Sequence, residues 1–318
     1  MTKNVLVTGG AGYIGSHTCK ALAQAGFVPI TYDNLSLGHR WAVKWGPFIN
    51  GDIGDRTALA AACARYRPIG IIHFAALSNV RESEKKPLEY FETNFAGTLN
   101  ALTVAKKEHI RYFVFSSSCA VYGIPDQAPI RETSPRKPIS TYGRSKALAE
   151  DMLATSGLCS AVLRYFNAAG ADPDGEIGES HTPETHLLPL ALETALKKRN
   201  QFTLYGIDHP TSDGTAIRDF IHVSDLAQGH VQALKWLIEH NQSLTLNLGT
   251  GHGYSVKEVI RSIESHLKTT LPLKVAPAFP GDPPILVADN AQAIRILNWS
   301  FRYSSLDQII TTALRWHR

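Results

Sequence analysis

The sequence has little of several features that mark specialised classes of protein. Its 318 residues include only four cysteines, and none of these forms a C-x-x-C pair or sits at zinc-ligand spacing, which argues against a disulfide scaffold or a cysteine-based metal site. No apolar run approaches the roughly 20 residues that span a bilayer. The opening residues, Met1–Asn4, lack the long apolar stretch of a signal peptide. We therefore expect a cytoplasmic protein that has no membrane partner.

A strong charge of one sign is also missing. The net charge is only +4, and the lysines and arginines are spread along the chain, so we expect no nucleic-acid partner. His181 and His186 are not three or four residues apart, which would place them on one helical face, so we expect no metal site there. With 44% hydrophobic and 19% charged residues, the composition is that of an ordinary globular protein.

Short apolar segments alternate with helical patterns through the first half of the chain. Strands that are apolar on both faces and alternate with helices indicate a parallel sheet covered on both sides, so we predict a Rossmann-type doubly wound α/β fold. The expected strands are Asn4–Thr8, Val28–Tyr32, Gly70–Phe74, Arg111–Ser116 and Ser160–Tyr165. The expected helices are Gly15–Gly26, Asp55–Tyr66, Pro87–His109 and a segment containing Ser145–Leu153.

A glycine-rich turn, T-G-G-A-G-Y-I-G, follows the first expected strand and ends at Gly15. Strand, turn, helix and a second strand ending near Asp33 together form the context of a dinucleotide site. Gly9, Gly12 and Gly15 would let a pyrophosphate approach the backbone, where the helix N-terminus offers free N–H groups. A carboxylate at Asp33 would bind a ribose 2′-hydroxyl and repel a 2′-phosphate, which predicts NAD rather than NADP.

After about residue 170 the character of the sequence changes. Loops rich in Gly, Pro, Asp and His appear at Ala169–Pro189, Tyr205–Arg218 and Ala276–Pro284. We therefore predict an NAD-binding Rossmann domain over residues 1–168 and a smaller, mixed α/β substrate domain over residues 169–318. The apolar segment Leu244–Leu248 is expected to return, near residues 244–249, to the first sheet.

Tyr142 and Lys146 form a Y-x-x-x-K pair, whose side chains would share one face of a helix. A nearby ammonium and a positive nicotinamide ring would both favour the phenolate form of a tyrosine, whose pKa is ordinarily about 10. Ser118 follows the fourth expected strand, where its hydroxyl could hydrogen-bond both a substrate hydroxyl and the tyrosine oxygen. The simpler alternatives are two exposed helix residues and a serine that caps a strand end.

These motifs, in this order, resemble those of the extended short-chain dehydrogenase/reductases. Further stretches resemble the UDP-galactose/UDP-glucose 4-epimerases specifically, and the similarity covers nearly the whole chain. They are G-Y-I-G-S-H-T (12–18), Y-D-N-L (32–35), H-F-A-A-L (73–77), L-R-Y-F-N (163–167), D-G-T (213–215), R-D-F-I-H (218–222) and N-L-G (247–249).

The resemblance implies a role for each matching position. The catalytic group would be Ser118, Tyr142 and Lys146. NAD would be surrounded by Gly9, Gly12, Tyr13, Ile14, Gly15, Asp33, Asn34, Asp52, Ile53, Phe74, Ala75, Asn94, Tyr142 and Lys146. The UDP-sugar substrate would be held by Ser118, Tyr142, Asn167, Tyr205, Arg218 and Asp282. A homodimer formed through two helices of the first domain is implied as well.

The implied reaction is the interconversion of UDP-galactose and UDP-glucose through a transient 4-keto sugar, with Tyr142 as the base. A UDP-pentose 4-epimerase would need the same catalytic group and stays open. A 4,6-dehydratase would need an acid/base pair where this chain has Cys119 and Ala120. A non-catalytic NAD-binding protein usually lacks the tyrosine or the lysine, and both are present here.

Three positions depart from the family pattern. Phe279 stands where the family usually has an arginine that contacts the diphosphate, which leaves Arg218 as the only matched cation. Ser78 stands where a lysine is common. Leu286 matches the position that limits sugar size, and its bulk is expected to disfavour N-acetylated sugars. Weaker UDP binding or a changed substrate is therefore a further expectation.

Overall fold

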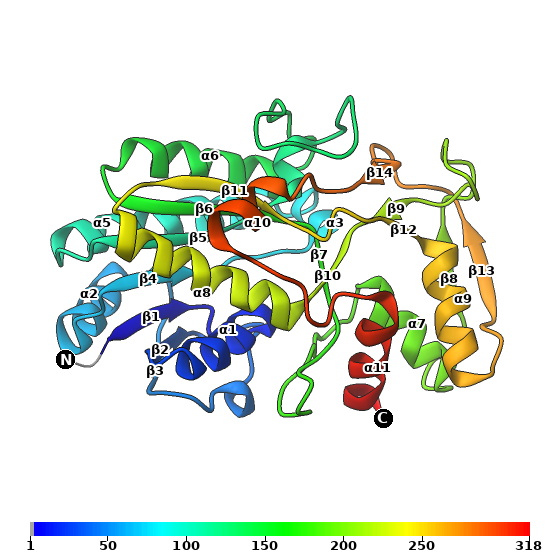
Figure 1. Ribbon diagram of the computed structural model, residues 1–318, viewed down its shortest axis with the longest axis horizontal. Coiled ribbons are helices and arrows are strands. Elements are labelled where there is room, and N and C mark those ends of the chain that lie inside the picture. The colour runs from blue at the N-terminus through cyan, green and yellow to red at the C-terminus, as the bar shows by residue number, and fades with distance from the viewer. Residues whose placement is uncertain (1–2) are drawn as a thin grey trace.

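A seven-stranded, fully parallel sheet runs through the centre of the larger half of the molecule, shown to the left in Figure 1. The computed structural model describes residues 3–318. Met1 and Thr2 therefore lie outside the described residues, although they belong to the opening segment in which we expect no signal peptide. From one edge to the other, the sheet contains β11 (Leu244–Leu248), β6 (Cys159–Tyr165), β5 (Tyr112–Ser118), β4 (Gly70–His73), β1 (Asn4–Thr8), β2 (Val28–Asp33) and β3 (Phe48–Asn50).

Helices cover both faces of this sheet, which confirms the predicted Rossmann-type fold (Figure 1). Alternate residues of β1 show the arrangement, because Val5 and Val7 belong to one buried cluster and Leu6 to the other. The first face is covered by α1 (Tyr13–Gln24), α8 (Val223–His240) and α10 (Ala291–Leu297). The second is covered by α2 (Arg56–Tyr66), α5 (Gly97–Lys107) and α6 (Thr141–Thr155).

Some element boundaries differ from the sequence prediction for local reasons. Helix α6 already begins at Thr141, because the Ser140 hydroxyl caps it by accepting the Gly143 N–H at 3.0 Å. Strand β3 was not predicted, since its three residues are too short to show a period. The long helix expected from Pro87 is divided into α4 (Pro87–Tyr90), a π-helical turn η2 (Phe91–Ala96) and α5.

The second half of the chain builds a separate core. Helices α7 (Leu187–Ala195), α9 (Val256–Leu267) and α11 (Leu306–His317) pack there with β8 (Phe202–Tyr205), which pairs with β13 (Leu273–Ala276). Two small sheets join this part to the main sheet. One consists of β7 (Asn167–Ala169) and β10 (Phe220–His222). The other consists of β9 (Ile217–Arg218), β12 (Tyr254–Ser255) and β14 (Ile285–Leu286). The division at residue 168 stays a prediction, because β11 and α10 come from beyond it yet pack with the first sheet.

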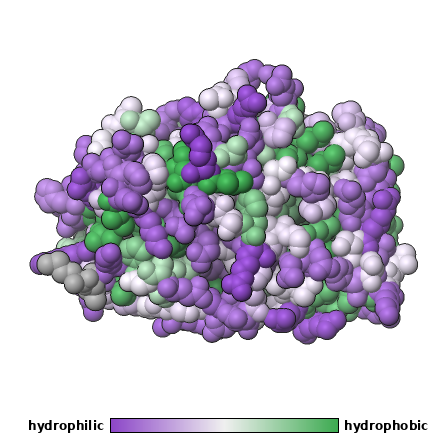
Figure 2. All heavy atoms as spheres, viewed as in Figure 1, coloured by the Kyte–Doolittle hydropathy of each residue, from purple (hydrophilic) through white to green (hydrophobic). Residues whose placement is uncertain are grey.

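The outer surface is mainly hydrophilic on the face that Figure 2 shows, and hydrophobic residues reach it only in small separate patches. Within residues 3–318, no helix combines the length and the apolar character needed to cross a membrane.

Candidate active site

The predicted cofactor and catalytic residues gather at one edge of the main sheet. The glycine turn follows β1, Asp33 ends β2, Phe74 follows β4, and Ser118 ends β5. These four strands are parallel and lie next to one another in the order β5-β4-β1-β2, so their carboxyl ends lie at the same edge of the sheet. The position is the one where ligands bind in open α/β sheets.

The glycine turn leaves no room for side chains. Gly9 has φ +70°, and a Cβ there would lie 2.7 Å from the Ala75 nitrogen. A Cβ on Gly15 would lie 2.1 Å from the Gly9 carbonyl oxygen. The N-cap of α1 is Gly12, which has no side chain to cap the helix, so the N-cap leaves the first N–H groups of α1 without a side-chain acceptor. The turn therefore fits a pyrophosphate group.

Asp33 is held in place by the turn that it faces. Its Oδ2 accepts the Ala11 N–H at 3.0 Å, and its Oδ1 accepts the Leu35 N–H at 2.8 Å. Burial raises the pKa of this carboxyl, and these two hydrogen bonds oppose the shift. At the rim, Asn34 donates to the Asp52 carboxylate at 2.6 Å, and Ile53 packs against Gly97 of α5. An oriented carboxylate at this place can bind a ribose hydroxyl.

Two predicted cofactor residues use their polar groups within the protein. The Asn94 amide, on η2, donates to the Leu77 carbonyl and accepts the Leu77 N–H, and it also donates to the Ser145 hydroxyl at 3.1 Å. It therefore ties the loop after β4 to α6. The Tyr13 hydroxyl donates to the Gly170 carbonyl at 2.6 Å, which joins the glycine turn to the second half of the chain.

Ser118, Tyr142 and Lys146 are all buried at the carboxyl end of β5, with exposed fractions of 8%, 6% and 3%. The Lys146 Nζ lies 6.0 Å from the centre of the Tyr142 ring and donates to the Ser116 carbonyl at 2.9 Å. The helix therefore places the phenol and the ammonium on one face, as the spacing of the motif predicts for α6. Their roles in catalysis stay a prediction.

Burial dominates the ionisation of this pair. It raises the pKa of Tyr142 well above its usual value, Tyr165 adds to the shift, and a hydrogen bond to Ser118 opposes it. Burial also lowers the pKa of Lys146 to about 7, against an opposing effect of Glu150. The polypeptide alone thus favours the neutral phenol.

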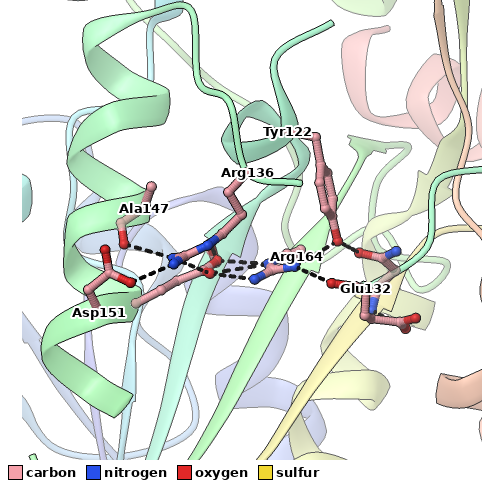
Figure 3. Close-up of polar contacts among 9 residues, drawn as sticks. Tyr122, Glu132, Arg136, Ala147, Asp151 and Arg164 are labelled. Carbon is pink, nitrogen blue, oxygen red and sulfur yellow. Dashed lines mark hydrogen bonds and ion pairs between the residues drawn. The ribbon is translucent and has the colours of Figure 1, made fainter. Parts of the chain in front are cut away.

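A buried ionic network holds helix α6 onto the sheet (Figure 3). Glu150 lies one turn after Lys146 on α6 and accepts hydrogen bonds from Arg164 of β6, including one of 2.6 Å from Nη2. It also accepts the Ser117 hydroxyl at 2.6 Å and Arg136 Nη1 at 3.2 Å. Arg164 reaches onward to the Tyr122 hydroxyl at 2.9 Å. The network therefore fixes α6, and with it Tyr142, relative to β5 and β6.

The residues predicted to hold UDP lie in the second half of the chain. Arg218 of β9 pairs with Asp282 at 2.6 Å, and the ring of Tyr205, at the end of β8, lies 4.5 Å from that of Phe279. Asn167 begins β7 and donates its backbone N–H to the Asp219 carbonyl. A cavity of about 250 Å³ adjoins Tyr205 and is lined also by Arg81, Glu184, Thr185, Leu190, Arg199, Gln201, Phe202 and Thr203.

No local pattern in the sequence singles out Arg81, which lies on the one-turn helix α3 (Val80–Ser83). Its guanidinium stacks on the Phe279 ring, 3.4 Å from the ring centre. Arg81 is therefore a cation near Phe279 in addition to Arg218, which is the only cation that matches the family pattern. Contacts between segments some 200 residues apart leave no local pattern in a sequence, so only the fold reveals them.

The loop before α7 brings four ionisable groups together. Glu179, His181, Glu184 and His186 place their ligand-type atoms within 4.8 Å of one another. The spacing argument used above considered a single helical face, and it missed this cluster because the segment folds as a loop. His186 Nδ1 lies 2.9 Å from both Glu179 and Glu184, so the cluster is a set of ion pairs.

This cluster predicts a loss of stability at alkaline pH. Burial would lower the pKa of both histidines, but the two glutamates outweigh it and raise the pKa of His181 to about 9 and of His186 to about 10. Because the folded pKa values exceed the ordinary 6.5, the stabilisation is complete below about pH 6.5 and is lost as the pH rises through 9 to 10. The melting temperature of Glu184→Gln should therefore fall less between pH 7 and pH 10 than that of the parent or of Glu193→Gln, a control on α7. Equal slopes for all three proteins would contradict this account.

A larger cavity lies elsewhere. It has a volume of about 480 Å³, is located between α1 and α8, and is lined by residues such as Lys20, Asp172 and Gln228. None of the predicted site residues lines it. Its size therefore does not make it the candidate active site, because the convergent polar groups lie at the strand ends.

Comparison with known proteins places this geometry in a family. Residues 5–249 match the model of the NAD dependent epimerase/dehydratase family. The UDP-glucose 4-epimerase of Rhizobium leguminosarum bv. trifolii is 48% identical over 99% of this chain and 97% of its own length.

Solved structures agree with the sequence comparison. The structure of UDP-glucose 4-epimerase from Brucella ovis in complex with NAD superposes with a TM-score of 0.96 at 47% identity, over 98% of both chains. That of the enzyme from Stenotrophomonas maltophila, with bound NAD and formylated UDP-arabinopyranose, gives 0.95 at 38% identity, over 99% of this chain and 98% of the other.

Proposed function

Because the chain belongs to the NAD dependent epimerase/dehydratase family, we propose that it interconverts UDP-galactose and UDP-glucose, with NAD as its cofactor and a transient 4-keto sugar as intermediate. The observation that carries this proposal is the burial of Tyr142, Lys146 and Ser118 together at the strand ends beside the glycine turn. The protein is an isomerase, since the overall reaction does not consume NAD.

The residues divide the chemistry among them. NAD, held by the glycine turn and Asp33, would supply the acceptor and donor for the hydride at C4 of the sugar. Tyr142 takes the proton of the 4-hydroxyl as the hydride leaves and gives it back as the hydride returns. Ser118 orients the sugar 4-hydroxyl, and Lys146, whose Nζ lies 6.0 Å from the centre of the Tyr142 ring, contributes positive charge that favours the phenolate. The glycine turn, Asp33 and the rim residues hold the cofactor against this group.

Inversion requires that the ketone present its second face. The sugar must therefore turn within the site while UDP stays bound, so the binding energy has to be concentrated on UDP and away from the reacting carbon. Asn167, Tyr205, Arg218 and Asp282 are the residues that we assign to UDP. Their place on segments of the second half of the chain, apart from the strands that carry the glycine turn and Ser118, supports this division.

The choice of sugar depends on residues near Ser118. Leu286 of β14 is buried in one cluster with Cys119, the residue that follows Ser118. A bulky side chain there leaves little room for an N-acetyl group, which favours simple hexoses. UDP-pentoses are the second candidate, and the neighbour crystallised with formylated UDP-arabinopyranose supports testing them.

A panel of UDP-sugars tests the assignment. The purified protein should interconvert UDP-galactose and UDP-glucose with no added reductant, and it should act poorly on UDP-N-acetylglucosamine. Turnover of UDP-xylose without turnover of the hexoses would move the assignment to a pentose epimerase. No turnover of any of these sugars by protein that retains NAD would contradict the enzymatic proposal.

We also propose that two copies associate through the helix layer formed by α4, η2, α5 and α6. These helices pack against one another, and α5 and α6 lie side by side in Figure 1. Three leucines on this layer are exposed, Leu88 by 81%, Leu99 by 47% and Leu148 by 43%. Exposed apolar side chains on neighbouring helices are typical of an interface between subunits.

Charged substitutions on this layer should prevent association. The double variant Leu99→Asp/Leu148→Asp should elute as a monomer in size-exclusion chromatography with light scattering, because a buried unpaired carboxylate opposes contact between the layers. Ile294→Asp on α10, which is exposed by 42%, is the matched control and should remain a dimer. A dimeric double variant, or a monomeric parent protein, would contradict the proposed interface.

A cytoplasmic location remains a prediction. The cysteines Cys19, Cys63, Cys119 and Cys159 are all unpaired thiols in the described chain, which supports a reducing compartment.

A further inference from the structure

We propose that Arg81 supplies the second positive charge of the diphosphate site, from the opposite wall to Arg218. The inference rests on the proposed UDP-sugar substrate. Arg81 belongs to α3, which follows β4 in the first half of the chain. The Arg81 guanidinium contacts residues of the second half of the chain, so this cation comes from the other half of the molecule than Arg218.

Two aromatic rings hold the Arg81 guanidinium in place. It lies 3.4 Å from the centre of the Phe279 ring and 4.7 Å from that of Tyr205. A planar guanidinium stacks on aromatic faces and keeps its N–H edges available, and those edges match the geometry of phosphate oxygens. Phe279 is therefore the platform for a cation, and the arginine missing from that position is replaced by one from α3.

The charge of Arg81 is not neutralised in the way that the charge of Arg218 is. Arg218 pairs with Asp282 at 2.6 Å, and the backbone of Asp282 hydrogen-bonds Phe279 in the same turn. Among residues 3–318, Arg81 has no carboxylate partner at ion-pair distance, and Asp282 acts on it only from further away. A fixed cation without a counter-ion at the mouth of the cavity beside Tyr205 is suited to an anionic ligand.

The position of Arg81 also limits what it can do. It lies with Tyr205 on the UDP side and is not in the group formed by Ser118, Tyr142 and Lys146. It is therefore a substrate-binding residue, whose loss should weaken binding of the ground state and the transition state alike. We expect Arg81→Ala to raise the KM for UDP-galactose and the Kd for UDP by roughly tenfold or more, as for a lost charge-assisted contact, with kcat changed less than about twofold.

The experiment compares UDP with uridine in titration calorimetry, alongside steady-state kinetics. A diphosphate contact predicts that Arg81→Ala weakens UDP binding while uridine binding is unchanged. Arg111→Ala is the matched control, since Arg111 is an exposed arginine that also stacks on a tyrosine but lies at the opposite end of β5. The double variant Arg81→Ala/Phe279→Arg should recover UDP affinity by returning a cation to the turn.

The outcomes separate this inference from the proposed function. If Arg81→Ala binds UDP as the parent protein does, or loses UDP and uridine equally, the inference is wrong although the epimerase activity stands. If the parent protein binds no UDP, the proposed function itself fails. Thermal melts of each variant establish that weakened binding does not come from unfolding.

Discussion

Tyr142→Phe should lower kcat by roughly 10²- to 10⁴-fold, the range typical of a lost general base. The substitution removes one hydroxyl from a side chain that is 6% exposed and leaves the ring, so the packing of α6 is preserved. NAD should stay bound, because the glycine turn, Asp33 and the rim residues are untouched. Steady-state rates with UDP-galactose, together with the NAD content of the purified variant, test both halves of this prediction.

Tyr165→Phe is the matched control for this variant. Tyr165 is a neighbouring phenol whose hydroxyl hydrogen-bonds Ser116 at 2.8 Å, and it raises the pKa of Tyr142. Its loss should cost far less activity, because its hydroxyl has no assigned part in proton transfer. Equal losses in the two variants would show that the pocket is sensitive to any lost phenol, and Tyr142 would no longer be distinguished as the base.

Glu150→Ala should lower the free energy of unfolding by about 3–5 kcal/mol, the cost of leaving buried charges without their partner. Glu150 is 5% exposed and accepts hydrogen bonds from Arg164, Arg136 and Ser117. Removal of the Glu150 carboxylate leaves the buried Arg164 guanidinium of β6 without its ion-pair partner. Urea denaturation at neutral pH measures the change.

Asp151, the residue that follows Glu150 on α6, provides the control for this variant. Asp151 pairs with Arg136 at 2.5 Å, but its side chain is 58% exposed, so Asp151→Ala should cost only about 0–1 kcal/mol. Activity should follow the same order, because α6 carries Tyr142 and Lys146. Similar losses of stability in the two variants would mean that the buried network does not fix the catalytic helix.

The sequence was sufficient for the features that depend on local pattern. The parallel sheet follows from apolar strands alternating with helices, and the glycine turn is recognisable because backbone contacts at Gly9 and Gly15 exclude any side chain. The shared helical face of Tyr142 and Lys146 follows from their spacing alone. These features needed no knowledge of how distant segments meet.

Apart from short elements such as β3, the main features that the sequence did not reveal depend on how the chain folds in space. Arg81 and Phe279 are in contact although nearly 200 residues separate them, and the cluster at Glu179–His186 depends on the path of a loop. The effect of burial on Tyr142 also lies outside any local pattern, because burial is the largest cause that raises the pKa of its phenol. Burial is a property of the assembled core and cannot be read from spacing.

In the proposed reaction, a hydride leaves C4 of the sugar and returns to the same carbon within one site. The most direct measurement uses UDP-galactose deuterated at C4, incubated with the purified protein in ordinary water and analysed by mass spectrometry and NMR. We predict UDP-glucose that retains the deuterium at C4, since a hydride held on bound NAD does not exchange with solvent. Loss of the deuterium to water during conversion would contradict the account.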